Sequence, residues 1–478
     1  MKNMTLKNIT ATCSGELVGT PTAAEVTGVV IDSRLLTVGN LFIATRGAQV
    51  DGHSFITSVA ANGAAAVVCE EPPDTDIDIP YILVTDSFQA LKDIASYYRK
   101  QLDITVIAIT GSVGKTSTKE FVAAVLAERF SVLKTAGNFN NEIGLPLTIL
   151  QIRAEHQVAV LELGINNFNE MSRLSQISCP DIAVITNIGD CHLQNLGNRA
   201  GVLRAKSEIF DYLADDGWAI VNAEDEWLDQ IKTVKNKTPL RFGSDITADD
   251  VRVSGLEGSD AYFTIHHKSL GTVGTSFPVH IPIPGEHMIT CALIAATVGG
   301  LMGLASAEIA KGLLNIQSVL GRSHIVRLAQ MTIIDDCYNA NPHSMKAAIR
   351  LLQRSEGRKV AILGDMFELG SEEMAFHAQI GRDAVAAKID VLVCIGQLAE
   401  HIHNAAVTYA LNSSDSQLEM HYFESKESFI AELTNILRHG DTVLVKASNG
   451  MKFFELVEKI KDNAENCHYS SAIPSSKK

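Results

Sequence analysis

The chain has 478 residues, of which 46% are hydrophobic and 20% are charged, and its formal net charge is −15 at pH 7. This length predicts about three domains. The negative charge disfavours general binding to nucleic acid or to an anionic membrane, since both reward clustered Lys and Arg. The apolar runs are too short to span a bilayer and residues 1–10 lack the apolar core of a signal peptide, so we expect a cytoplasmic protein without stable membrane insertion.

The first 86 residues contain short apolar runs separated by Gly and Asp turns, at 26–31, 41–44, 65–69 and 81–84. This spacing predicts a small N-terminal α/β domain over residues 1–86. Asp32, Ser33 and Arg34 follow the first run, at the end of a strand where ligands of open α/β sheets usually bind. Taken alone, such residues are more often turn caps or surface residues.

Residues 104–120, ITVIAITGSVGKTSTKE, predict a phosphate-binding loop between a buried strand at 104–109 and a helix at 119–129. Two glycines allow the backbone to turn tightly with its N–H groups pointing inward, the lysine can reach terminal phosphates, and the threonine can offer its hydroxyl to Mg²⁺. The strict pattern needs glycine at 109, where this chain has Ile109, so the loop is a variant. Its order of strand, loop and helix favours nucleotide binding over an empty turn. The predicted ATP-binding residues of the loop are Gly111, Ser112, Val113, Gly114, Lys115, Thr116 and Ser117.

A helix at 87–100 leads into a central domain that we expect over residues 87–320. Strand-like runs at 158–163, 182–187 and 218–222 alternate with helical stretches, which predicts a mostly parallel sheet.

Two polar residues follow strands of this predicted sheet. Glu162 closes one strand and His192 follows another, so both should lie at the carboxyl edge beside the phosphate loop. Mg²⁺ prefers oxygen ligands, which makes Glu162 and Thr116 candidates. His192 is a less natural Mg²⁺ ligand and, taken alone, would more often be a simple loop residue.

From Thr332 the pattern restarts, with further apolar runs at 359–365, 390–396 and 442–448, which predicts a third, Rossmann-like α/β domain over residues 321–478. The predicted fold class is therefore α/β in three domains: a small N-terminal domain, a central phosphate-loop domain of the mononucleotide-binding type with a parallel sheet, and a C-terminal α/β domain.

Several segments together resemble the Mur ligases of peptidoglycan synthesis, over about residues 26–455: TGSVGKTSTKE, GNFNNEIGLPLTIL, LELG, NIGDCHLQNLG, RAKSEIF, GRSHIV, DDCYNANPHSMKAA and LGDMFELG. The resemblance implies an ATP-dependent amide ligase, monomeric, whose N-terminal domain holds a UDP-sugar. Its central domain would hold ATP and Mg²⁺, and its C-terminal domain would close over the site with the amine substrate. Four segments, IDSR, GNFNNEIGLP, DDCYNANPHSM and LGDMFELG, are most similar to family members that join D-alanyl-D-alanine to UDP-N-acetylmuramoyl-tripeptide. The pattern does not distinguish diaminopimelate from lysine as the third residue of the tripeptide.

The resemblance also implies roles for individual residues. Lys115 and Lys206, the latter as a carbamate, would act in catalysis together with Glu162 and His192. The metal would be held by Thr116, Glu162, His192 and Lys206. Further ATP contacts would come from Asn187, Arg322 and Asp336, and substrate contacts from Asp32, Ser33, Arg34, Asn140, Asn141, Asn339 and Asn341.

The sequence departs from the family pattern at two places. Met288 and Cys291 replace asparagines, the second of which is expected to read adenine, and Asn449 replaces the arginine of a K-G-S-R segment. Two alternative functions follow: another Mur-type or folylpolyglutamate-type ligase, or a nucleotide-binding regulator that has lost catalysis. The YNANPHSM segment argues against the first alternative, and the retained metal and lysine positions argue against the second.

Overall fold

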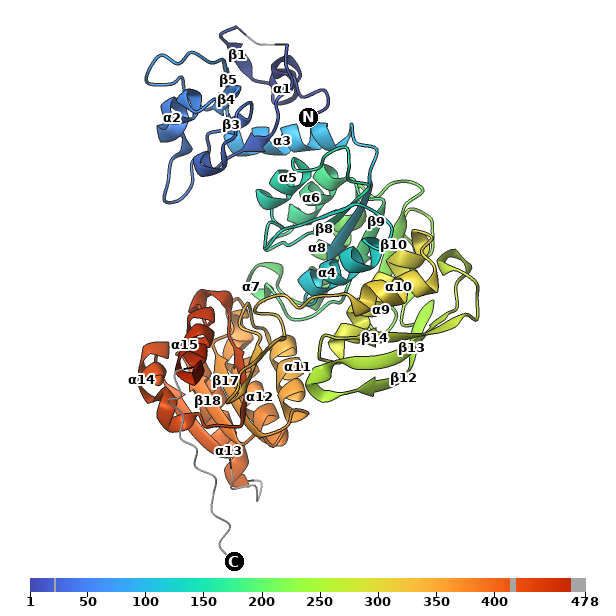
Figure 1. Ribbon diagram of the computed structural model, residues 1–478, viewed down its shortest axis with the longest axis vertical. Helices are drawn as coiled ribbons and strands as arrows, with labels where there is room; N and C mark the ends of the chain where they lie inside the picture. Colours follow the sequence, from blue (N-terminus) through green and yellow to red (C-terminus); the bar gives the residue numbers. More distant parts are fainter. Residues whose placement is uncertain (21–22, 413–417, 466–478) are drawn as a thin grey trace, which may run out of the picture.

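The computed structural model describes residues 1–20, 23–412 and 418–465, which form three sheets flanked by helices (Figure 1). The sheets follow one another along the chain, as the predicted α/β organisation requires. The end of the predicted C-terminal domain, residues 466–478, lies outside the described residues.

The first sheet has five strands in the order β1-β5-β4-β3-β2, all parallel except β1, which is antiparallel to β5. The four predicted apolar runs are strands, and the short half-exposed β1 at the sheet edge was missed. The elements are β1 (Glu16–Val18), β2 (Val29–Val30), β3 (Leu41–Ile43), β4 (Ala66–Cys69) and β5 (Tyr81–Leu83), with α1 (Leu6–Thr12), α2 (Ile56–Ala61) and α3 (Ser87–Arg99).

The central sheet has nine strands in the order β14-β13-β12-β11-β10-β9-β6-β8-β7. The strands from β7 to β12 in this order are parallel, while β13 and β14 add an antiparallel extension that was not predicted. The strands are β6 (Thr105–Thr110), β7 (Val132–Lys134), β8 (Val158–Glu162), β9 (Ile182–Ile185), β10 (Trp218–Asn222), β11 (Leu240–Phe242), β12 (Ile246–Val253), β13 (Ser259–Ile265) and β14 (Ser276–Ile281). The helices are α4 (Lys115–Leu126), α5 (Gly144–Ile149), α6 (Glu170–Ser178), α7 (Leu193–Leu196), α8 (Arg199–Ser207), α9 (His287–Leu301) and α10 (Ser306–Leu314).

Strand β6 lies inside this sheet, between β9 and β8, and is buried on both faces. Val106 and Ala108 belong to the core shared with the N-terminal domain, whereas Ile107 and Ile109 belong to the core under α4 and α9. Burial on both faces explains the uninterrupted apolar run of this strand. Helix α4 begins at Lys115 and not at 119 as predicted, because the phosphate loop enters the helix directly.

The C-terminal sheet has six strands in the order β15-β16-β20-β17-β18-β19, with only β15 antiparallel. The four predicted strands are present. The two edge strands, whose half-buried residues lack an apolar run, were missed. The elements are β15 (His324–Arg327), β16 (Thr332–Asp335), β17 (Arg358–Gly364), β18 (Val391–Ile395), β19 (Glu419–Phe423) and β20 (Asp441–Lys446), with α11 (Pro342–Gln353), α12 (Glu373–Ala386), α13 (Ala399–Asn412), α14 (Lys426–Ile436) and α15 (Phe454–Glu465).

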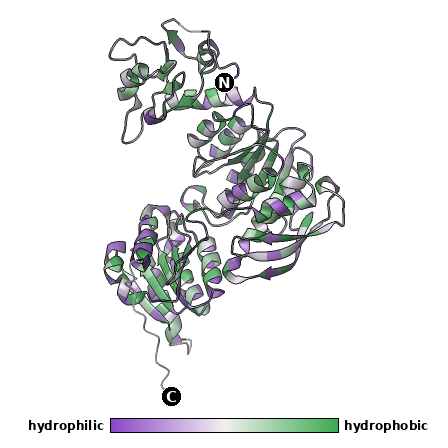
Figure 2. Ribbon diagram, viewed as in Figure 1, coloured by the Kyte–Doolittle hydropathy of each residue, from purple (hydrophilic) through white to green (hydrophobic). Residues whose placement is uncertain are grey.

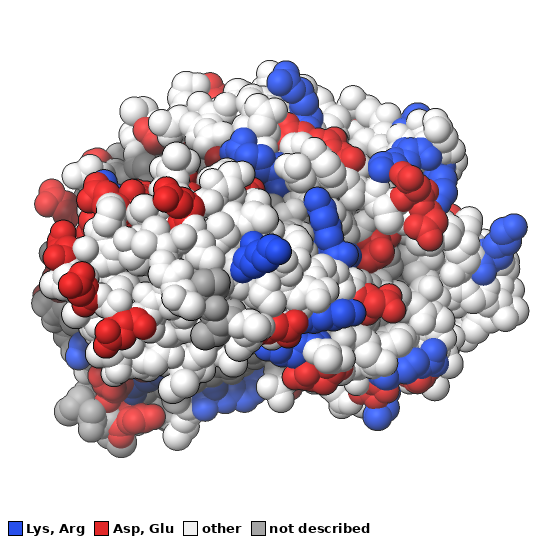
Figure 3. Space-filling view, turned by 90° about the horizontal axis from the view of Figure 1, so that it is seen from above, with Lys and Arg blue, Asp and Glu red and all other residues white. Residues whose placement is uncertain are grey.

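Hydrophobic residues concentrate in the central strands and on the helix faces that cover them (Figure 2). Acidic and basic side chains are interspersed over the face drawn in Figure 3. Within the described ranges, no helix has the length and apolar character needed to cross a membrane.

Candidate active site

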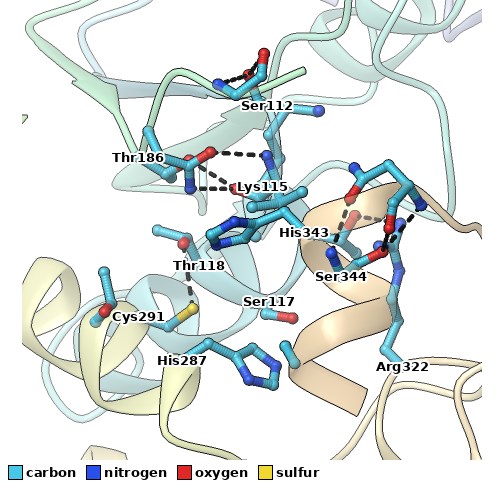
Figure 4. Close-up of a pocket in the computed structure, with 18 of the residues that line it drawn as sticks. Ser112, Lys115, Ser117, Thr118, Thr186, His287, Cys291, Arg322, His343 and Ser344 are labelled. Atoms are coloured by element: carbon cyan, nitrogen blue, oxygen red, sulfur yellow. Dashed lines mark hydrogen bonds between the residues drawn. The ribbon is translucent and has the colours of Figure 1, made fainter. Parts of the chain in front are cut away.

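A cavity of about 430 Å³ lies between the phosphate loop (residues 111–117) and helix α11 of the C-terminal domain (Figure 4). Its lining comes from the loop and α4, the ends of β9 and β10, the start of α9, and the segments around Arg322, Asp336 and α11. Segments far apart in the sequence therefore share one cavity. The predicted site residues that line it are Ser112, Val113, Gly114, Lys115, Thr116, Ser117, Asn187, Arg322, Asp336, Asn339 and Asn341.

Two glycines give the phosphate loop its path. Gly114 has φ +82, in the left-handed region that favours glycine, and it is the residue from which α4 starts. At Gly111 a Cβ atom would lie 1.9 Å from Oγ1 of Thr186, the residue that follows β9, so a side chain would clash there. The first-turn N–H groups of α4, which have no intrahelical acceptors, are thereby directed at the cavity with the positive end of the helix dipole.

Asn187 shapes this loop through three hydrogen bonds. Its carbonyl accepts from the Ser112 N–H at 3.0 Å, its Oδ1 accepts from the Val113 N–H at 3.0 Å, and its Nδ2 donates to the Val113 carbonyl at 3.0 Å. The side-chain amide is thus engaged with the protein at both ends. Asn187 lines the cavity but acts first as a brace for the loop.

Lys115 lies inside the loop, where its Nζ donates to the Gly111 carbonyl at 2.9 Å. Desolvation lowers the pKa of its ammonium, and the carboxylate of Glu162 opposes this shift. The lysine and Glu162 therefore interact electrostatically at the carboxyl edge of the sheet, as the sequence predicted for their positions.

Glu162 ends strand β8 and is 2% exposed. Its Oε1 accepts from Asn140 Nδ2 at 2.8 Å, whereas its Oε2 is buried without a hydrogen-bond partner among the described residues. A buried carboxylate oxygen without a partner is unfavourable, and a hard cation would satisfy it. Glu162 therefore fits a metal-binding role.

Lys206 is buried near the end of α8, with 1% of its surface exposed. Burial lowers the pKa of this lysine to about 8, the nearby Cys191 raises it, and the Lys115 ammonium lowers it. A lysine with a lowered pKa carries a larger fraction of neutral, nucleophilic amine at a given pH than a solvated lysine does. The position thus suits covalent chemistry at the amine better than an ordinary solvated helix lysine does.

His192 occupies a different environment from the other catalytic candidates. Its backbone has φ +51, and its Nδ1 lies 2.9 Å from Oε2 of Glu368, in the loop that follows β17 of the C-terminal domain. The cavity lining does not include three of the catalytic candidates, which are Glu162, His192 and Lys206; all three lie within the part of the chain that the structure describes. Lys115, which does line the cavity, interacts electrostatically with two of them, Glu162 and Lys206.

The C-terminal domain contributes a buried ion pair to the cavity wall. Asp336 Oδ2 accepts from Lys446 Nζ at 2.6 Å, and Asp336 Oδ1 accepts from the Ser323 N–H at 3.0 Å. Lys446 also donates to the carbonyl of Asn339 at 2.9 Å. These bonds fix the β16–α11 connection and the segment that carries Arg322.

Arg322 reaches across to the central domain. Its guanidinium lies 4.2 Å from the ring centroid of Tyr338 and donates to Thr116 Oγ1 at 3.3 Å. The arginine is thus placed at the first turn of α4, where a phosphate would lie. Asn341 has a local role, because its Oδ1 accepts from the Ser344 N–H at 2.8 Å and caps α11.

The substrate candidates of the first sheet lie outside this cavity. Asp32 caps the 3₁₀ turn Ser33–Leu35 and pairs with Arg34 at 2.7 Å, and the hydrogen bonds from Arg34 lower the pKa of Asp32 to about 2. The Arg34 side chain is 86% exposed and so remains open to a ligand. In the central domain, Asn141 Oδ1 accepts from two N–H groups at the start of α5.

Several lining residues were not among the predicted site residues. His287, at the start of α9, and His343, in α11, face each other across the cavity, and burial lowers the pKa of both imidazoles (Figure 4). The strand ends also contribute Asn222, Glu224 and Asp225. The segment PGEHMITC contains His287, but only the fold shows that it faces the phosphate loop.

The two residues that depart from the family pattern on α9 also line the cavity. Cys291 Sγ accepts from Thr118 Oγ1 at 3.5 Å, and burial raises the pKa of its thiol to about 11. Met288 lies one turn earlier on the same helix. Asn449 donates from Nδ2 to the Tyr338 carbonyl at 3.0 Å, so it holds the loop beside Arg322.

Three domain families match the chain in sequence order: the Mur ligase family catalytic domain at residues 25–111, the Mur ligase middle domain at 109–299, and the Mur ligase glutamate ligase domain at 321–449. The chain is 36% identical over 474 residues to the UDP-N-acetylmuramoyl-tripeptide--D-alanyl-D-alanine ligase of Escherichia coli, covering 97% of this chain and 99% of that one. It is 38% identical over 467 residues to the enzyme of the same name from Bacillus subtilis, covering 96% and 99%.

Solved structures agree with this result. MurF from Acinetobacter baumannii superimposes with a TM-score of 0.86 at 31% identity, covering 96% of this chain and 98% of that one. MurF ligase from Thermotoga maritima in complex with ADP gives a TM-score of 0.77 at 26% identity, with coverage of 92% and 98%. The three-domain fold is therefore confirmed, and the chain belongs to the Mur ligase family.

Proposed function

We propose that this chain is an ATP-dependent, ADP-forming ligase that joins D-alanyl-D-alanine to UDP-N-acetylmuramoyl-tripeptide, giving the pentapeptide precursor of peptidoglycan. One structural observation carries the proposal: the phosphate loop and the C-terminal segment from Asp336 to α11 line the same cavity. An amide ligase needs this arrangement, because the nucleotide and the amine substrate must meet at one carboxyl group. The nearly full-length relatives that bear this enzyme name support the substrate assignment.

The reaction starts from a carboxylate, which is a poor electrophile. The terminal carboxylate of the tripeptide attacks the γ-phosphorus of ATP, the bond to the bridging oxygen breaks, and ADP leaves with formation of an acyl phosphate. The amine of D-alanyl-D-alanine then attacks the acyl carbon, phosphate leaves, and the ammonium proton is lost to give the amide. Lys115 and the first-turn N–H groups of α4 would stabilise the charge on the phosphoryl oxygens, and Arg322 is placed to assist them.

A divalent cation would complete the site. The unpartnered Glu162 Oε2 fits such an ion, with Thr116 and the carbamate form of Lys206 as further oxygen donors and His192 as a nitrogen donor. Bound Mg²⁺ supplies positive charge to the phosphoryl oxygens. The chain's own residues fix the donors in place: Asn140 holds Glu162, and Asn187 holds the loop that carries Thr116.

The remaining substrate contacts are assigned to all three domains. Asp32, Ser33 and Arg34 would bind the UDP-sugar, with Asn141 near its diphosphate. Asn339 and Asn341 would meet the amine substrate and nucleotide at the cavity wall. We further propose the domain boundaries 1–86, 87–320 and 321–478. We also propose that the protein is a monomer and that it acts in the cytoplasm, where ATP and the UDP-linked substrate occur.

Phosphate release in the presence of ATP, UDP-N-acetylmuramoyl-tripeptide and D-alanyl-D-alanine tests the proposal directly. We expect release that requires all three compounds, together with the pentapeptide product detected by mass spectrometry. Release with glutamate or another amino acid in place of D-alanyl-D-alanine would indicate a related ligase. Binding of ADP without phosphate release under any of these conditions would indicate a regulator and would contradict the proposed function.

A further inference from the structure

The contact between His192 and Glu368 joins the central and C-terminal domains, and neither residue lines the ATP cavity. Helix α7, which His192 precedes, contacts the 3₁₀ turn Gly370–Glu372 that follows Glu368, and α7 lies directly beside the C-terminal domain in Figure 1. Nδ1 of His192 and Oε2 of Glu368 are 2.9 Å apart, which is hydrogen-bond distance. One ring nitrogen of the proposed metal-binding histidine is therefore occupied by a carboxylate from the other domain.

Both residues are held in an uncommon backbone conformation. His192 has φ +51 and Glu368 has φ +65, in the left-handed region that residues other than glycine adopt at a cost. Such conformations persist only where the surrounding structure imposes them. The chain thus turns sharply at each of the two residues, at the point where the domains meet.

The loop that presents Glu368 is anchored in the C-terminal domain through the two residues that precede it. The Met366 N–H donates to Nε2 of the buried His377 at 2.9 Å, and the Phe367 N–H donates to Ser448 Oγ at 2.9 Å. The Glu368 carboxylate is consequently carried on a fixed support. It can reach His192 only when the C-terminal domain is docked against α7.

The loop that presents His192 is anchored in turn to the phosphate loop. Cys191, the preceding residue, is buried and donates from Sγ to Ser112 Oγ at 3.2 Å, and Ser112 Oγ accepts from the Gly189 N–H at 2.8 Å. A histidine that binds a metal through one nitrogen commonly donates its other N–H to a carboxylate, which fixes the ring and its tautomer. Glu368 meets this requirement from the opposite domain.

We propose that Glu368 is a positioning residue for the metal site: it orients His192 from the C-terminal domain, so that full metal affinity is reached only in the docked arrangement. This inference rests on the proposed role of His192 in metal binding. It follows that metal binding and domain docking stabilise each other, because each favours the same arrangement. Glu368 itself does not touch substrate or metal in this assignment.

Binding of Mn²⁺ to the full chain with saturating ADP tests the proposal, with free Mn²⁺ measured by electron paramagnetic resonance. We expect Glu368→Ala to weaken Mn²⁺ binding by about 10- to 100-fold, as for loss of other carboxylates that orient metal-binding histidines. Glu368→Gln keeps an acceptor oxygen and should lose less. Glu372→Ala removes an exposed glutamate from the 3₁₀ turn that follows Glu368; it is the matched control and should bind as the wild type.

Two further measurements distinguish an error in the role of Glu368 from an error in the assignment of His192 as a metal ligand. In a His192→Ala background, Glu368→Ala should cause no additional loss, because the carboxylate acts through the histidine. The nitrogen hyperfine signal of bound Mn²⁺ should be present in the wild type and absent in His192→Ala. Unchanged Mn²⁺ affinity in Glu368→Ala, or an equal loss in both backgrounds, would overturn the role of Glu368. Unchanged affinity and signal in His192→Ala would instead overturn the underlying assignment of His192.

Discussion

Lys446 Nζ donates to Asp336 Oδ2 at 2.6 Å, at the carboxyl ends of the adjacent parallel strands β20 and β16. Both side chains are largely buried. The same ammonium reaches the Asn339 carbonyl, so this one cation holds the whole β16–α11 connection against the sheet. The wall of the ATP cavity that comes from the C-terminal domain therefore depends on a buried charge pair.

Lys446→Met should destabilise this region strongly, because it leaves the Asp336 carboxylate buried without its partner, at a cost of about 3–5 kcal/mol. Hydrogen exchange followed by mass spectrometry should show faster exchange in the peptides that cover β16 and β20, by about 150- to 5000-fold. Lys459→Met, on the exposed face of α15, is the control and should leave exchange unchanged. Wild-type protection in Lys446→Met would mean that the pair does not support the cavity wall.

Lys115→Ala should abolish ligation while the fold remains intact. The lysine makes its hydrogen bond within the phosphate loop, and its ammonium would act on phosphoryl oxygens, so we expect kcat to fall by about 100- to 1000-fold. Far-ultraviolet circular dichroism checks the fold, and Lys134→Ala, an exposed lysine on β7, controls for loss of charge. Near-normal turnover in a folded Lys115→Ala protein would refute ATP binding at this loop.

The sequence predicted those features that local pattern determines. The uninterrupted apolar run of β6 predicted a strand buried on both faces, because such a strand has no polar face. The glycines after it predicted a phosphate loop, because they allow the tight turn that this loop needs. The edge strands β7, β15 and β19 were missed, since their half-buried residues show no apolar run. The antiparallel strands β13 and β14 were missed as well, although their burial alternates along each strand.

Sequence patterns indicated which residues gather around the site, but they did not indicate the hydrogen bonds that these residues make. Asn187 was predicted as a nucleotide ligand, and the structure shows that its amide braces the loop. Asn341 was predicted as a substrate ligand, and it caps α11. The contact of His192 with Glu368 joins positions in different domains, so it depends on how the domains dock. Such partners follow from tertiary structure, and no spacing within a single segment encodes them.

Arg34→Ala should raise the KM for the UDP-linked substrate far more than the KM for ATP. The guanidinium is exposed and lies on the N-terminal sheet away from the ATP cavity, and a contact to diphosphate or carboxylate acts chiefly in ground-state binding. Steady-state kinetics with each substrate varied in turn measures the effect. Lys7→Ala removes an exposed cation elsewhere on the same domain and should change neither KM. A rise confined to the KM for ATP would remove this domain from UDP-sugar binding.

Cys291→Asn should strengthen ADP binding. The Cys291 thiol lies in the cavity wall, and burial raises its pKa to about 11, so the thiol stays protonated. A thiol is only a weak hydrogen-bond donor, whereas an asparagine offers two donors and an acceptor to adenine. One net hydrogen bond of about 1 kcal/mol corresponds to roughly five-fold in Kd. Titration calorimetry with ADP measures this, with Cys291→Ala as the variant that removes the thiol without adding an amide. Equal Kd values for the two variants would show that adenine does not contact this position.

Lys206 should form a carbamate with CO₂, and the fraction of Lys206 that is carbamylated should fall as the pH is lowered. The neutral amine is the form that attacks CO₂, and burial lowers the pKa of Lys206 to about 8. As the pH falls below this value the amine becomes protonated, so the carbamate should decrease towards acidic pH. A carbamate also replaces a cation beside Lys115 by an anion with the oxygen donors that Mg²⁺ prefers. Carbon nuclear magnetic resonance with labelled CO₂ should show a carbamate signal that is absent in Lys206→Ala.

Activity measurements on the same variant test whether the carbamate is used. Lys206→Ala should lose most of its ligase activity, and a short-chain carboxylate added to it should restore part of that activity by occupying the vacated anionic position. Lys232→Ala, an exposed lysine of the same domain, should keep both the signal and the activity. Full activity in Lys206→Ala would remove this residue from the mechanism. Loss of activity without rescue, together with an unchanged carbamate signal, would place the modification at another lysine.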